Sequence, residues 1–454
     1  MHEYELRNMN AKTYKAYVYP IIIFTLSIAI RLTYNITIAH SYQPTFDAAL
    51  YDIIARNIVS HHCYCISNSH QAVSRPPFWP FVISAIYYFF GENEFYARLF
   101  YCFLGSGTCV VIYFFARDLF GRRIGLYSGI IAALYPGLFI YDGWLYSESL
   151  YTFLTTSFIY TLFRLQRSSP AVQNPSEQQW LNKLSYKMVK QRYLFLCGLL
   201  LGFITLTRPN GVLLLGLVGI WGVFVAVAKI LPWHIVLKYM LVIACIAAII
   251  VIPWTYRNYT VTHKFVLVST GMGEVLLGAY NNIIVDGDPE VRGRWRPPAD
   301  ARNHDAFGYT PDDDKADTMR ALSWIFTHLN TIPYILALHF ANMWIPYTYA
   351  HGLPFEAYLN QPAAQVIIYA ITITTILMVG LAVIGFFVTW RLKKQQLLTV
   401  YLFLAMTIMQ NIAFYSDMRF RAPIEPLLVL LAGGMLWWLT LVFAKKPLPT
   451  KAPF

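Results

Sequence analysis

Long apolar runs separated by short polar stretches make up most of the chain. The runs lie near 18–39, 95–116, 124–141, 147–163, 193–207, 211–228, 239–255, 364–389, 397–414 and 423–443. A helix of about 20 residues crosses a hydrocarbon core of about 30 Å, and outside a closed barrel only a helix satisfies its backbone polar groups in lipid. The pattern therefore predicts ten spanning helices. Two further apolar stretches, 78–90 and 332–348, are short or interrupted by proline and predict surface helices, re-entrant segments or extra spans, for a total of ten to thirteen.

Positive charges indicate which loops face the cytoplasm. If the N-terminus is cytoplasmic, every cytoplasmic loop carries Lys or Arg, from Arg117, Arg122 and Arg123 in the first to Lys445 and Lys446 after the last span. The first span follows a polar segment, 1–16, and is expected to be a retained signal anchor. This topology leaves two large extracytoplasmic segments, 40–94 and 256–363. The second of them is rich in acidic residues, so we expect function to face that side.

Composition agrees with this interpretation. The 454 residues are 57% hydrophobic and only 13% charged, whereas soluble domains carry about a quarter charged residues. The net charge of +12 is spread over loops and forms no basic face, so a nucleic-acid partner is not expected. The predicted fold class is an all-α polytopic membrane protein, with 1–454 forming one domain in the inner or plasma membrane.

The cysteines do not indicate a disulfide framework. Four of the six lie inside apolar runs, where a thiol usually packs as a small hydrophobe. The remaining two join three histidines in a compact group that has zinc-ligand chemistry but no standard spacing: His61, His62, Cys63, Cys65 and His70. An ordered loop is the preferred interpretation there.

Two helix starts are predicted in the extracytoplasmic segments. Thr310 followed by Pro311 and three aspartates is typical of a helix N-terminus, here a surface helix. In the first segment, Thr45 is placed to cap a short helix that begins at Phe46, with Asp47 and Tyr51 on one face. Asp47 then lies at a membrane boundary, where it either serves a site or merely favours the helix start.

Arginines and carboxylates recur at the outer boundary. Arginine geometry suits phosphate, although an isolated Arg near a helix end more often snorkels to the interface. The candidates for an anionic ligand are Arg75, Arg98, Arg208, Arg257, Arg419 and Arg421. Asp142 and Glu148 lie at the same boundary, where a carboxylate tends to face a cavity or a partner; an ion pair with Arg98 or Arg208 is the alternative.

Several short motifs, taken together in their order, resemble those of the GT-C membrane glycosyltransferases. Within that group the chain is similar to the branch that uses polyprenyl-phosphate sugars, which includes protein mannosyltransferases and the lipid A aminoarabinose transferase. The motifs are Asp47 with Tyr51, Arg75-Pro-Pro, Gly91 to Arg98, Phe120-Gly121, Pro136, Ser147-Glu148, Thr207-Arg-Pro-Asn-Gly, Pro253-Trp-Thr-Tyr-Arg-Asn-Tyr and Arg419-Phe-Arg-Ala-Pro-Ile-Glu-Pro.

The resemblance implies transfer of a sugar, with inversion, from a polyprenyl-phosphate donor to an extracytoplasmic protein, lipid or polysaccharide. Asp47 matches the first-loop acid that acts as general base or orients the acceptor, with Glu148 and Asp142 as further catalytic candidates. Arg75 matches the position that meets the donor phosphate. Ala48 stands where many relatives have a second acid, so the resemblance does not decide whether a divalent metal is bound.

Two other functions remain open at this stage. A transporter or flippase of lipid-linked saccharides would also need outer arginines and carboxylates, but no internal repeat is found in the sequence. A membrane scaffold would explain the spans but not the boundary charges. Convergence of Asp47, Arg75 and Glu148 on one outer cavity would favour the enzyme, separate positions a scaffold, and a path through the bilayer a transporter.

Overall fold

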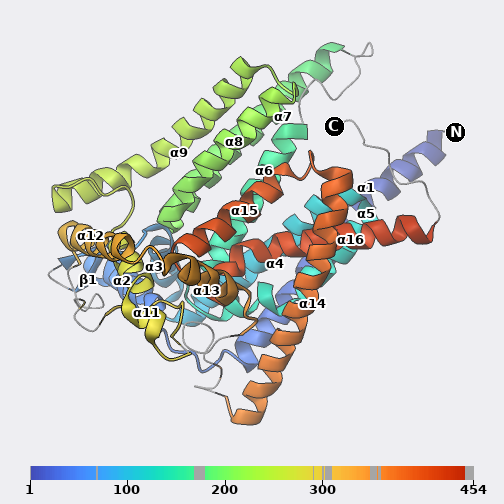
Figure 1. Ribbon diagram of the computed structural model, residues 1–454. Coiled ribbons are helices and arrows are strands. Elements are labelled where there is room, and N and C mark those ends of the chain that lie inside the picture. Colours follow the sequence, from blue (N-terminus) through green and yellow to red (C-terminus); the bar gives the residue numbers. More distant parts are fainter. Residues whose placement is uncertain are drawn as a thin grey trace.

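The computed structural model describes residues 2–67, 70–167, 179–289, 291–298, 301, 309–347, 355 and 359–444. These residues are almost entirely helical, which confirms the all-α prediction (Figure 1). The long helices are α1 (His2–Thr37), α4 (Glu94–Phe120), α5 (Arg122–Leu134), α6 (Glu148–Arg167), α7 (Gln179–Thr207), α8 (Leu213–Val227), α9 (Trp233–Thr262), α14 (Gln361–Lys393), α15 (Leu398–Ala413) and α16 (Glu425–Phe443). The strands described are β1 (Cys65–Ser67) and β2 (His70–Gln71), an antiparallel pair.

Each of the ten predicted spans coincides with a helix in the described chain. Six are long and apolar enough to cross a membrane: Tyr17–Thr37, Glu94–Phe120, Pro209–Val227, Trp233–Thr262, Gln361–Lys393 and Met418–Phe443. The other four, α5, α6, α7 and α15, are shorter or less apolar. By length and composition the described helices thus give six spans, or seven if the bent pair Pro311–Thr327 and Ile332–Trp344 is one span, against the predicted ten to thirteen.

One predicted span is interrupted where the sequence places a proline. The stretch 124–141 is helical only to Leu134, because Pro136 follows, and proline disfavours helix at the residue before it and removes a donor. Two short 3-10 helices, η1 (Pro136–Leu138) and η2 (Ile140–Gly143), continue the chain. These helices and the buried segment 140–147 connect α5 to the start of α6.

The described part of the second large segment, 256–363, which the sequence predicts to be extracytoplasmic, folds into short helices. They are α10 (Met272–Ala279), α11 (Asn282–Asp286), α12 (Pro311–Thr327) and α13 (Ile332–Trp344). Thr310 caps α12 in a capping box with Asp313, which confirms the predicted helix start. α13 turns by 116° from α12. The predicted stretch 332–348 therefore begins as a separate 13-residue helix and does not continue α12 in a straight line.

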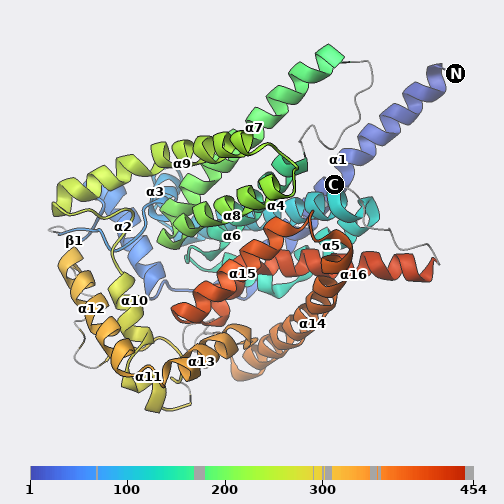
Figure 2. The same cartoon turned by 45° about the horizontal axis from the view of Figure 1, so that its top comes forward.

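The short helices gather at one end of the bundle. Figure 2 shows α2 (Asp47–His61), α3 (Phe78–Phe90), β1 and α10 to α12 together, away from the far ends of α7, α1 and α16. α2 packs on α3, and α10 packs on α12. The two extracytoplasmic segments predicted from the sequence therefore form one layer, into which the connection between α7 and α8 and the connection between α15 and α16 also lead.

Candidate functional site

Two carboxylates and three arginines form one connected cluster at this end of the bundle. Asp47 Oδ1 lies 3.1 Å from Arg75 Nη2 and Asp47 Oδ2 lies 3.2 Å from Arg419 Nη2. Glu148 Oε1 lies 3.2 Å from Arg419 Nε and 2.5 Å from Arg208 Nη2. Positive and negative groups thus alternate from Arg75 to Arg208, and three guanidinium groups against two carboxylates leave one net positive charge.

The five side chains come from five separate segments. Asp47 begins α2, Arg75 follows β2, Glu148 begins α6, Arg208 lies between α7 and the 3-10 helix η4 (Pro209–Val212), and Arg419 lies in the 3-10 helix η6 (Met418–Ile424). Both carboxylates occupy the first position of a helix, where the helix dipole favours negative charge. Asp47, Arg75 and Glu148 therefore lie together in one cluster.

The start of α2 differs from the predicted one. The residue before the helix is Phe46, whose backbone is left-handed at φ 51°, and no side chain caps it, so the prediction that Thr45 is the cap is wrong. A positive φ is unusual for a bulky residue and is typical of strained functional segments. Phe46 is exposed, which leaves Asp47 at a turn that opens away from the core.

Asp47 is the most exposed acid of the cluster. Its side chain is 34% exposed, against 1% for Glu148. Burial around Asp47 favours the neutral carboxyl, but Arg75 and Arg419 outweigh this effect and lower the pKa below its ordinary value. Asp47 is therefore an ionised, accessible carboxylate at neutral pH.

Glu148 connects two arginines inside the protein. One of its oxygens faces both Arg208 and Arg419, and the other, buried, has no hydrogen-bond partner among the described residues. Arg208 also donates from Nε to Ser147 Oγ over 3.0 Å. The neighbouring carboxylate Glu148 raises the pKa of Arg208 although burial alone lowers it. These contacts hold two guanidinium groups close together, which their mutual repulsion would otherwise prevent.

Aromatic rings surround the cluster, and sequence reasoning missed most of them. The Arg419 guanidinium lies 4.7 Å from the Tyr146 ring centre and 5.1 Å from that of Phe420. Arg208 lies 5.3 Å from the ring of Tyr151. Tyr51, predicted to line the site, is buried, and burial together with the charge of Asp47 raises its pKa to about 12. The available signal was adjacency, since Tyr146 and Phe420 directly neighbour the charged motifs.

The other three predicted phosphate ligands are engaged elsewhere. Arg98 donates to the Ala39 carbonyl, and Arg421 pairs with Glu425 and donates to the Met343 and Ile345 carbonyls. Arg257 donates to the Ala72 and Tyr64 carbonyls. These contacts anchor loops to helices, the structural alternative for an arginine near a helix end.

Asp142 also belongs to another cluster. Its Oδ2 lies 2.7 Å from Arg31 Nε, and both side chains are buried. The expected alternative partners were Arg98 and Arg208, so the ion pair is present but with a different arginine. Burial raises the pKa of Asp142 to about 6 despite Arg31. In this structure Asp142 is part of the helix packing between α1 and η2.

A metal does not fit the Asp47 cluster as built. A divalent cation requires several oxygen ligands turned toward one point, whereas both oxygens of Asp47 and the Oε1 of Glu148 face guanidinium groups. Within the described ranges no group of three or more His, Cys, Asp or Glu side chains comes together. In the group of histidines and cysteines at 61–70, where an ordered loop was preferred to a zinc site, Cys63 and Cys65 form a disulfide. This bridge corrects the expectation that no disulfide framework is present. The His70 side chain lies outside the described residues.

Comparison with known proteins agrees with the motif resemblance. Residues 71–269 match the family model described as dolichyl-phosphate-mannose-protein mannosyltransferase. The structure resembles AglB, the oligosaccharyltransferase of Archaeoglobus fulgidus, in complex with an inhibitory peptide and a dolichol-phosphate, with a TM-score of 0.55 and 12% identity over 96% of this chain. The chain has the GT-C fold. It is an integral, multi-pass membrane protein, and it spans only 51% of the length of AglB.

Other comparisons add little to this conclusion. An Archaeoglobus fulgidus oligosaccharyltransferase tethered to an acceptor peptide is 13% identical, with a TM-score of 0.55; the match covers 96% of this chain and 50% of that protein. ArnT from Cupriavidus metallidurans bound to undecaprenyl phosphate is 15% identical and covers 93% of this chain and 78% of its own, but its TM-score of 0.45 is too low to support an argument. No curated protein matches by sequence. Similarity at these identities concerns the GT-C fold alone.

Proposed function

We propose that this protein is a membrane glycosyltransferase that moves a sugar, with inversion at the anomeric carbon, from a polyprenyl-phosphate donor to an acceptor outside the cytoplasm. The observation that carries the proposal is the continuous cluster from Arg75 through Asp47, Arg419 and Glu148 to Arg208. The family-model match and the GT-C fold support a glycosyltransferase that uses a lipid-phosphate donor.

Asp47 is the general base in this proposal. Its carboxylate takes the proton from an acceptor hydroxyl or amine as the nucleophile bonds to the anomeric carbon from the face opposite the phosphate. The bond between that carbon and the phosphate oxygen breaks, and the electron pair leaves with the lipid phosphate. A base must be ionised and reachable to act, and Asp47 is both.

The three arginines stabilise the leaving phosphate. Charge builds up on that phosphate in the transition state, and fixed guanidinium groups in a site shielded from water stabilise it without reorganisation. Arg75, Arg208 and Arg419 are 12 to 15% exposed, so they are held in place but not sealed off. Glu148 supports the last two as a positioning residue.

The charge distribution and the disulfide support an extracytoplasmic position of the cluster. The cluster lies in segments placed outside by the positive-inside pattern. The Cys63–Cys65 disulfide supports the same side, because disulfides persist in oxidising compartments. Cys63 lies 16 residues after Asp47 in the chain.

The proposal is tested by transfer from a panel of polyprenyl-phosphate sugars to protein, lipid and polysaccharide acceptors in membranes that carry the protein. The product is analysed by NMR for its anomeric configuration. Arg208→Ala is compared with Arg56→Ala, since Arg56 is an arginine of α2 outside the cluster that pairs with Asp52. The proposal is supported if the wild type and Arg56→Ala transfer the sugar with inversion and Arg208→Ala does not. Movement of intact lipid-linked saccharide without transfer would favour a flippase instead.

A further inference from the structure

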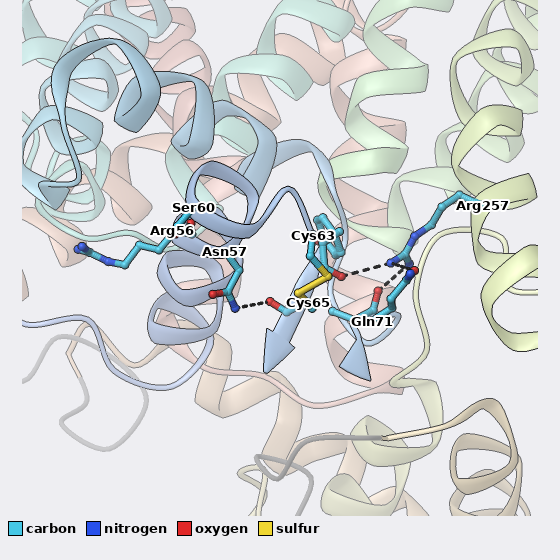
Figure 3. The surroundings of a disulfide bond; sticks show 9 residues. Arg56, Asn57, Ser60, Cys63, Cys65, Gln71 and Arg257 are labelled. Carbon is cyan, nitrogen blue, oxygen red and sulfur yellow. Dashed lines mark hydrogen bonds between the residues drawn. A yellow bond between two sulfur atoms is a disulfide. The ribbon is translucent and has the colours of Figure 1, made fainter. Parts of the chain in front are cut away.

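The disulfide between Cys63 and Cys65 closes a turn that contains a single residue, Tyr64. The two Cα atoms lie 5.3 Å apart, and the bridge stands at the start of the β1–β2 hairpin. Asn57, near the end of α2, donates from Nδ2 to the Cys65 carbonyl over 2.8 Å, as Figure 3 shows. The helix that begins with Asp47 is thereby fastened to the disulfide-closed turn near its other end.

Tyr64 connects this turn to the segment that carries Arg75. Its side chain is buried, and its hydroxyl donates to the carbonyls of Arg75 and Pro76, each over 3.1 Å. The ring packs edge-on against Trp254 at 4.7 Å between ring centres. The Tyr64 hydroxyl therefore holds the backbone at Arg75, and the disulfide between its two sequence neighbours restrains Tyr64 itself.

Arg257 fastens the hairpin to α9. Its Nη2 donates to the Tyr64 carbonyl over 3.2 Å and to Gln71 Oε1 over 3.1 Å, and its Nη1 donates to the Ala72 carbonyl over 2.7 Å. Figure 3 shows the arginine reaching from α9 to the hairpin beside the disulfide. The Val73 carbonyl accepts in addition from the Thr270 amide over 3.0 Å. The residue before β1 and the residues at and after the end of β2 are thus bound to Arg257 and Thr270.

Arg75, whose backbone Tyr64 contacts, is a member of the Asp47 cluster. Arg75 Nη2 lies 3.1 Å from Asp47 Oδ1, and Arg75 Nη1 donates to the Ser74 carbonyl over 3.1 Å. The position of the guanidinium relative to Asp47 therefore depends on where the backbone of residues 74 to 76 stands. Displacements of about 1 Å in such groups can cost about a hundredfold in rate.

We propose that Tyr64, held by the Cys63–Cys65 disulfide and by Arg257, is a positioning residue that aims Arg75 at the lipid phosphate. The inference rests on the proposed function only in that the anion is a polyprenyl phosphate. Reduction by a dithiol breaks the sulfur–sulfur bond, gives two thiols and leaves the oxidised reagent as a cyclic disulfide. The released turn then holds Arg75 less firmly.

The test measures the affinity of the purified full-length protein for undecaprenyl phosphate, which requires no sugar transfer. Tyr64→Phe is made in the wild type and in Arg75→Ala, and Tyr280→Phe serves as control because the Tyr280 hydroxyl also donates to a carbonyl, that of Ala413. We expect Tyr64→Phe to weaken binding about fivefold, as loss of a hydrogen bond worth about 1 kcal/mol would, but to have no effect once Arg75 is absent. The Tyr280 variant binds normally.

The disulfide is tested in the same assay. A dithiol reductant is expected to weaken binding by the wild type to the level of the Cys63→Ser/Cys65→Ser double variant, and to leave the double variant unchanged. Equal losses from Tyr64→Phe with and without Arg75 would overturn the proposal, as would alkylation of both cysteines without prior reduction. If binding follows the expected pattern but no donor sugar is transferred, the proposed transferase activity fails while this inference stands.

Discussion

Arg419 Nη2 donates to Asp47 Oδ2 over 3.2 Å although the two residues are 372 positions apart in the chain. The same guanidinium faces Glu148 at 3.2 Å. Arg419 therefore joins the exposed acid to the buried one, and it does so from a 3-10 helix at the entry to α16. The contact between these two residues brings the first large segment, 40–94, and the entry to α16 into one cluster.

Replacement of Arg419 by Ala is expected to lower kcat/KM for sugar transfer by about 10² to 10³, the usual cost of one group that stabilises developing charge. Arg419→Lys should recover only part of the loss, because an ammonium cannot face both carboxylates in the same fork. Steady-state kinetics with Arg56→Ala as control measures this. Unchanged kinetics in Arg419→Ala would remove this arginine from the site.

Replacement of Glu148 by Gln should reduce stability as well as activity. The variant leaves Arg208 and Arg419 facing each other around a neutral amide, and loss of one partner of a buried ion pair costs about 3 to 5 kcal/mol. Thermal unfolding in detergent measures the effect. Asp312→Asn is the control, since Asp312 pairs with Lys264 at an exposed position. Equal melting temperatures for the two variants would contradict the supporting role of Glu148.

The pH dependence of transfer follows from the lowered pKa of Asp47. The base is active when ionised, so activity is present above this pKa and is lost as the pH falls through it, below the ordinary carboxyl range. Arg75→Ala removes the strongest of the charges that lower this pKa, so the acid limb of log kcat/KM should move to higher pH. An acid limb that stays in place in Arg75→Ala would show that another group titrates.

The buried pair of Arg31 and Asp142 gives a prediction about stability alone. A Cβ added at Gly105 would collide with Asp142 Oδ2 and Arg31 Nε, whereas a Cβ at Gly216 would meet nothing within 4 Å. Gly105→Ala should therefore lower the melting temperature, and Gly216→Ala should leave it unchanged or raise it slightly through helix propensity. Equal effects of the two variants would argue that the ion pair between α1 and η2 does not pack tightly against α4.

The helices and the first members of the site could be predicted because they depend on local pattern. Apolar run length placed every long helix, and Thr310, Pro311 and the following aspartates indicated the start of α12. Asp47, Arg75 and Glu148 were each recognisable from short motifs. Their convergence was only a hypothesis, since it depends on how α2 and α6 pack.

The sequence could not separate the two kinds of arginine. Arg208 and Arg419 contact carboxylates, while Arg98 and Arg257 donate to backbone carbonyls. All four stand at helix ends beside aromatic residues, and only the tertiary fold decides which acceptor is near. The partner of Asp142 was missed for the same reason, because Arg31 lies inside an apolar run that predicts a plain membrane helix.

The most direct test of the account compares sugar transfer by the wild type and by Asp47→Asn in membranes with equal amounts of correctly inserted protein, across the donor panel, with Asp312→Asn as control. The account predicts transfer by the wild type and the control and its loss in Asp47→Asn, with binding of the lipid phosphate retained. Full activity in Asp47→Asn would contradict the role of Asp47 as base, and no transfer by the wild type from any donor would contradict the transferase itself.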